Sequence, residues 1–173
     1  MDRKEAFGIL DKLNAPEHLK RHVSLVGEAA DLIIKYLDEH EIKLRMDFIR
    51  SGVVIHDIGK IVHPHEMTGA GSNHEPEGQK ILSEMGYSSE LARVCISHAQ
   101  WHKMDCSDEE IIIALSDKLW KGKRVPDLEL RVIDRIAILR GKDRWDIFEE
   151  LDSLFENIAA GGDERLQRSI SYY

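Results

Sequence analysis

Apolar side chains recur at steps of three and four residues along most of this chain, and this spacing limits its fold more than any other feature. The longest run extends from Pro16 to about His40. Its apolar positions are Leu19, Val23, Val26, Ala30, Ile33, Ile34 and Leu37. Because an α-helix repeats every 3.6 residues, the run predicts one long amphipathic helix with a buried face. No segment keeps the alternation of a strand, so the sequence predicts an all-α fold.

The same spacing, together with local start and stop signals, predicts six further helices. Ser107 followed by Glu110 matches a capping box, and Gly86 and Gly122 stand where helices commonly end. The expected helices cover about residues 44–56, 75–85, a segment from Ser88 or Ser89 through Ile96, 107–121, 128–139 and 145–158. Residues 61–73 predict a loop, and Gly161-Gly162 ends the pattern before a short tail.

Length and charge narrow the classes of function. A chain of 173 residues can bury a core without disulfides or a structural metal. Its formal net charge of −8 repels polyphosphate backbones, which argues against binding to long nucleic acid. No apolar run approaches the roughly 20 residues of a membrane span. The first residues lack a signal-peptide pattern, and the two cysteines form no disulfide framework, so we expect a cytoplasmic protein.

Histidine and aspartate residues stand at positions that the helical pattern expects to be buried. His56 and Asp57 are adjacent, so they can converge on one ion only where a helix ends, and Gly59 fits such an ending. The other positions are His22, His74, His98 and Asp117. Taken singly, each has an ordinary explanation: a core histidine, a helix cap or a structural ion pair. Together they form the ligand set of divalent first-row metals.

The order of these residues resembles that of the HD-domain superfamily of metal-dependent phosphohydrolases. The string His56-Asp57-Ile58-Gly59-Lys60 is the most specific part of the resemblance, which covers about residues 15–125. The resemblance implies a helical domain. The length and the helical pattern predict a single domain, 1–173, in which the helices of residues 126–173 pack on this core. It also implies one or two divalent transition metals, drawn from Fe, Mn, Co, Ni and Zn.

The resemblance further implies a ligand assignment. His22, His56, Asp57 and Asp117 would hold a first metal, and Asp57 would bridge to a second metal held by His74 and His98. The chain departs from the cyclic-dinucleotide branch, because residues 99–103 after His98 lack a glycine-tyrosine-proline signature. The spacing is more similar to the small single-domain branch that includes dinucleoside-tetraphosphate hydrolases.

The implied activity is hydrolysis of a small phosphate ester or anhydride, with a nucleotide as the expected substrate, by a metal-bound hydroxide. Asp57 and Lys60 are the candidate catalytic residues. Lys60, Lys118, Arg124 and His102 are the candidate substrate-binding residues. Each also has an ordinary interpretation, because cations near a helix C-terminus complement its dipole and His102 fits an exposed helix end.

Three alternatives remain open on the sequence alone. The same ligands occur in diiron oxygenases that resemble this superfamily, where they activate dioxygen instead of water. The chain could instead be a nucleotide-binding regulatory module, or a helical scaffold with buried histidines. The amphipathic helices of residues 127–158 could close the core or form the face of a homodimer.

Overall fold

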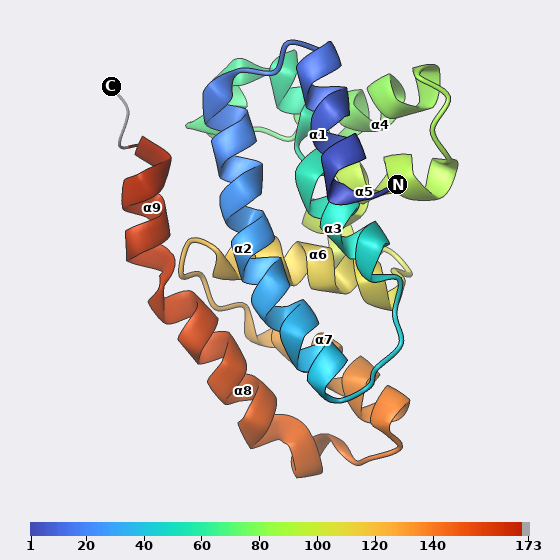
Figure 1. Ribbon diagram of the computed structural model, residues 1–173, viewed down its shortest axis with the longest axis vertical. Coiled ribbons are helices and arrows are strands. Elements are labelled where there is room, and N and C mark those ends of the chain that lie inside the picture. The colour runs from blue at the N-terminus through green and yellow to red at the C-terminus, as the bar shows by residue number, and fades with distance from the viewer. Residues whose placement is uncertain (171–173) are drawn as a thin grey trace.

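The computed structural model describes residues 1–170, and within them the chain is helical without strands, as the sequence predicts. The long α2 runs through the middle of the view in Figure 1 and packs its buried face against other helices, chiefly α3 and α6. The α-helices are α1 (Arg3–Lys12), α2 (Glu17–Glu39), α3 (Met46–Ile55), α4 (His74–Glu84), α5 (Ser89–Gln100), α6 (Asp108–Leu119), α7 (Pro126–Arg140), α8 (Arg144–Ala160) and α9 (Gly162–Ile170). Three short 3₁₀ helices are η1 (Ile58–Ile61), η2 (Pro64–Met67) and η3 (Trp101–Lys103).

Helices α2 to α8 correspond to the seven predicted ones, whereas α1 and α9 were not expected. The capping box at Ser107 and Glu110 is present at the start of α6. Helix α1 is only ten residues long and buries just three of them, so its periodic signal is short. Helix α9 buries only Gly162 and Arg165, and therefore has no apolar stripe facing the core. The expected loop 61–73 contains η2 and begins at the end of η1.

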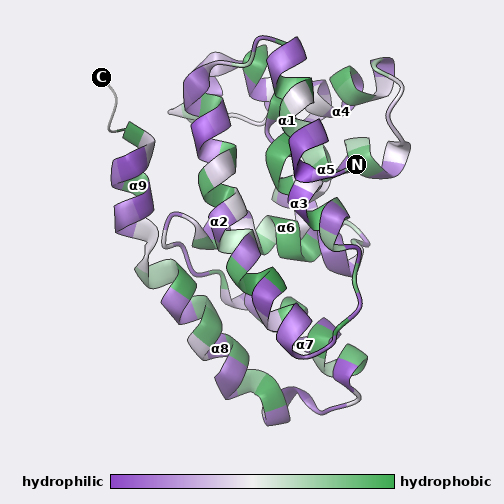
Figure 2. Ribbon diagram, in the orientation of Figure 1, coloured by the Kyte–Doolittle hydropathy of each residue, from purple (hydrophilic) through white to green (hydrophobic). Residues whose placement is uncertain are grey.

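Helices α3 and α6 lie in the middle of the core. Val53, Val54 and Ile55 at the end of α3 are at most 1 % exposed, and α6 buries ten of its twelve residues. Figure 2 shows both helices as largely hydrophobic, whereas α8 is hydrophobic mainly along one side. The buried apolar residues form two clusters, and α2, α3 and α5 contribute to both. These three helices therefore have little freedom to shift relative to one another.

Helix α9 is fixed to the end of α6 by a buried arginine. Arg165 donates hydrogen bonds to the backbone carbonyls of Leu119, Trp120 and Ile158. At the start of α9, Gly162 lies so close to the backbone of Gly122 that a Cβ atom would overlap it. The C-terminal helices thus close over the turn that follows α6.

The end of α3 packs directly against α4, and Gly59 makes this possible. A Cβ atom at residue 59 would overlap the carbonyl oxygen of His74 and lie 2.7 Å from the amide nitrogen of Gly78. The helix does end before Gly59, as predicted, but Gly59 is not in the left-handed region. Glycine is therefore required here by the close approach of two backbone segments.

No helix within residues 1–170 combines the length and apolar character that a bilayer span needs.

The substitution Gly59→Ala should lower the free energy of unfolding by about 3 kcal/mol, because the added methyl group forces η1 away from α4. Urea denaturation would measure the change. Gly8→Ala in α1 is the matched control, since a Cβ atom there meets nothing within 4 Å. It should be neutral or stabilising by about 0.5–1 kcal/mol. Equal stability of the two variants would contradict the packing described for Gly59.

Candidate metal centre

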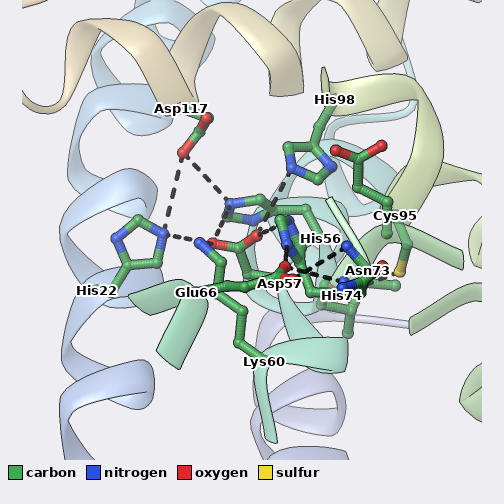
Figure 3. A network of polar contacts seen from close by, with 12 residues as sticks. His22, His56, Asp57, Lys60, Glu66, Asn73, His74, Cys95, His98 and Asp117 are labelled. Atoms are coloured by element: carbon green, nitrogen blue, oxygen red, sulfur yellow. Dashed lines mark hydrogen bonds and ion pairs between the residues drawn. The ribbon is translucent and has the colours of Figure 1, made fainter. Parts of the chain in front are cut away.

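Six side chains from five parts of the chain converge in one buried centre (Figure 3). All are at most 9 % exposed. His22 comes from α2, His56 and Asp57 from the end of α3, and His74 from the first position of α4. His98 comes from α5 and Asp117 from α6. These are the six residues that the sequence singled out as candidate metal ligands.

The carboxylate of Asp57 lies between two sets of imidazoles. Its Oδ2 atom is 3.0 Å from His22 Nε2 and 3.5 Å from His56 Nε2. Its Oδ1 atom is 3.2 Å from His74 Nε2 and 3.6 Å from His98 Nε2. The two oxygens of one carboxylate therefore face different histidine pairs.

Asp117 stands on the first of these two sides. Its Oδ1 atom is 3.4 Å from His56 Nε2 and 3.9 Å from His22 Nε2. The ligand atoms of His22, His56 and Asp117 all lie within 4.8 Å of one another, as do those of His56, Asp57 and His98. Both groups are compact enough to surround one ion.

The outer nitrogens of three rings are occupied by acceptors. His56 Nδ1 lies 2.9 Å from the Val53 carbonyl, and His98 Nδ1 lies 3.2 Å from the Val94 carbonyl. His74 Nδ1 lies 2.6 Å from Glu66 Oε2. A carbonyl or carboxylate oxygen can only accept, so each Nδ1 carries the proton. The Nε2 lone pairs then face the centre, as metal ligation requires.

Several inward-facing atoms lack a hydrogen bond of normal geometry despite these close approaches. Among residues 1–170 they include the Nε2 atoms of His22, His56 and His74 and the Oδ1 atom of Asp57. Buried polar atoms are normally paired, because leaving them unsatisfied costs free energy. A divalent cation would satisfy all of these atoms and offset two buried carboxylates, so the residues present fit such an ion.

The protonation states also suit a metal. Burial alone would raise the pKa of Asp57, but the nearby imidazoles of His56 and His22 lower it well below its usual range. The pKa of Asp117 is also lowered well below its usual range, because contacts with His56 and Lys118 outweigh burial. Burial lowers the pKa of His98 to about 3. These carboxylates are thus ionised and His98 is neutral near pH 7.

Two lysines lie against the carboxylates of the centre. Lys60 Nζ is 2.6 Å from Asp57 Oδ2, and Lys118 Nζ is 2.7 Å from Asp117 Oδ2. Both lysines line a pocket of about 790 Å³ that opens from the centre. Lys121 and His18, to which the sequence gave no separate role, line it as well.

Two candidate substrate-binding residues are not among the pocket's lining. Arg124 instead pairs with Glu129 and with Asp152, at 2.8 and 2.5 Å. His102 is exposed on η3, where its ring lies 5.5 Å from that of Trp101. The structure therefore brings Lys60 and Lys118 to the pocket and leaves Arg124 and His102 outside it.

Sequence reasoning missed Glu66, which supports His74 from outside the centre. Besides the contact with Nδ1, its carboxylate accepts hydrogen bonds from the backbone N–H groups of Asn73 and His74. A Cβ atom at Gly71 would overlap this carboxylate. Glu66 lies in an aperiodic segment eight residues before His74, so no spacing rule could link the two. Only the glycine-rich stretch around Gly71 hinted at a close approach.

Comparison with known proteins gives one result. A family model described as the HD domain matches residues 19–136, which include all six residues of the centre. No curated protein and no solved structure matches the chain. The family match spans well over half of the 173 residues, and the helical fold agrees with it. The chain therefore belongs to the HD domain family, whose members are generally metal-dependent hydrolases.

Proposed function

We propose that this protein hydrolyses a small phosphate ester or anhydride, with a nucleotide as the expected substrate. In this proposal His22, His56, Asp57 and Asp117 would hold one divalent metal, and His74 and His98 together with Asp57 would hold a second. The observation that carries the proposal is the position of Asp57, whose two oxygens face different histidine pairs. A carboxylate so placed can ligate two ions at once.

Divalent ions held by these residues would supply the chemistry of water activation and would neutralise charge on the phosphoryl group. Hydrolysis forms a new bond from the water oxygen to phosphorus and breaks the bond to the leaving oxygen, which takes up a proton. The chain's own contribution is to hold the ligands rigidly. Glu66 orients the His74 ring, and backbone carbonyls orient His56 and His98.

Lys60 and Lys118 supply positive charge where the phosphoryl oxygens would lie. Each ammonium group has three donors, and its carboxylate partner occupies only one of them. The remaining donors can bind nonbridging oxygens of a substrate in the pocket. The two lysine ammonium groups beside the centre favour an anionic substrate. They thus favour hydrolysis over the dioxygen chemistry of the diiron alternative.

Removal of the Asp57 carboxylate should abolish metal binding on both sides of the centre, because both proposed metals share this ligand. We expect the purified protein to bind about two equivalents of Mn²⁺ or Fe²⁺, His74→Ala about one, and Asp57→Asn close to none. Elemental analysis after loading and gel filtration would measure this. His40→Ala is the control, since His40 pairs with Glu150 instead of the centre. A wild-type protein that retains no stoichiometric metal would contradict the proposal.

Removal of one lysine should weaken turnover without releasing metal. We expect Lys60→Ala to lower kcat/KM for a phosphorylated substrate by about 100-fold, because a donor that stabilises developing charge is lost. The assay is phosphate release from a panel of phosphorylated metabolites with Mn²⁺, Fe²⁺, Co²⁺, Ni²⁺ or Zn²⁺. Lys35→Ala, at an exposed pair with Glu39, is the control and should retain full activity.

The phosphate-release assay, together with measurements of oxygen uptake and nucleotide binding, separates hydrolysis from its rivals. An effect of Lys60→Ala below twofold would remove the lysine from the reaction. Oxygen uptake by the iron-loaded protein, without phosphate release from any compound, would replace hydrolysis with oxygenase chemistry. Tight nucleotide binding without turnover would make the protein a regulatory module.

A further inference from the structure

The C-terminal helix α9 presents its only two large apolar side chains to the pocket. Leu166 and Ile170 are 37 % and 69 % exposed, and both belong to the pocket's lining. They are four residues apart, so they share one face of the helix. The rest of α9 is mainly charged or polar, and Figure 2 shows it mostly as hydrophilic. Neither side chain belongs to the two clusters of buried apolar residues that form the core, so core packing does not account for their position at the pocket.

Helix α9 is held at this position independently of those side chains. Arg165 fixes it to the carbonyls at the end of α6. Arg168 pairs with Glu28 on α2, and Arg21 donates a hydrogen bond to the carbonyl of Ser169. Figure 1 shows α9 beside the first half of α2, the helix that carries His22. Helix α9 is therefore anchored to α2 and to the end of α6, and these two helices also carry His22 and Asp117 of the centre.

The pocket has two chemically different parts. Its polar part holds the carboxylates and imidazoles of the centre with Lys60, Lys118 and Lys121. Its apolar part includes Leu166, Ile170 and Met67 of η2. Trp120 connects the two parts, because its ring lies 4.9 Å from that of His22 and its carbonyl accepts a hydrogen bond from Arg165. A ligand that fills the pocket needs an anionic end and an apolar end.

We propose that α9 forms a binding subsite for the leaving group, and that it selects phosphate esters whose leaving group carries an aromatic base over those with a bare sugar. This inference rests on the proposed function, since it assigns a substrate class to that site. A pocket of about 790 Å³ is within the range of sites for ligands of nucleotide size. Helix α9 lies beyond residues 19–136, so this selectivity is a property of this chain outside the family match.

The test compares two substrates that differ only in the base. The metal-loaded protein is assayed with a nucleoside 5′-monophosphate and with ribose 5-phosphate. We expect wild type to prefer the nucleotide in kcat/KM by at least about tenfold. The double variant Leu166→Gln/Ile170→Gln should reduce this ratio to about two by raising KM for the nucleotide. Its kcat and metal content should not change, because binding shared by ground and transition states affects KM alone.

A matched control lies on α7. Ile138 and Leu139 are 71 % and 45 % exposed and are not part of the pocket's lining. Ile138→Gln/Leu139→Gln should keep the wild-type ratio. Glutamine favours helix, so both double variants should remain folded. The single variants Leu166→Ala and Ile170→Ala repeat the test with smaller changes and should each lower the ratio about threefold.

The outcomes separate this inference from the proposed function. Hydrolysis of both compounds with no preference in wild type overturns the inference and leaves the hydrolase assignment standing. An unchanged ratio in the α9 variants does the same. If the metal-loaded wild type hydrolyses neither compound and no other phosphate in the wider panel, the proposed function is contradicted. The inference is then contradicted as well.

Discussion

The buried carboxylate of Asp57 is the group on which the rest of the centre depends. An ionised carboxylate at 2 % exposure is costly unless cations or donors surround it. The Lys60 ammonium on η1 donates to one of its oxygens, and four imidazole Nε2 atoms from α2, α3, α4 and α5 approach the two oxygens, where divalent cations would be shared between the rings and the carboxylate. Gly59 lets η1 approach α4 closely enough for His74 to reach Oδ1. The charge at Asp57 and the packing of the core therefore constrain each other.

Sequence periodicity was sufficient to predict the longer helices that bury an apolar stripe. It was insufficient for α1, which buries only three residues, and for α9, which has no such stripe. Helix α2 was predicted within one residue at each end because twelve of its residues are buried. Helix α9 was missed because its attachment depends on one buried guanidinium and three backbone carbonyls. Hydrogen bonds to carbonyls leave no trace in a hydropathy pattern, so an element held by them is invisible to that method.

The residues of the candidate site were also predicted only in part. All six residues brought to the centre were identifiable, since histidine and aspartate on apolar helices conflict with burial unless they share a partner. Glu66 was not, because it lies in an aperiodic segment eight residues before its partner His74. Arg124 illustrates the opposite error: its neighbourhood in sequence suggested the pocket, but Glu129 on the next helix and Asp152 on α8 hold it elsewhere. Proximity in sequence after Asp117 did not distinguish Lys118 from Arg124.

The metal centre is held by the packed core, whereas Leu166 and Ile170 on α9 are partly exposed at the pocket. This difference determines how substrate preference can change. The ligands sit on helices that belong to one or both of the core clusters, so a substitution there disturbs packing and charge together. Leu166 and Ile170 are partly exposed and belong to neither core cluster, and surface substitutions of this kind usually alter stability by about 0.5 kcal/mol or less. Variation on α9 can therefore reshape the pocket while the centre between α2 and α6 stays intact.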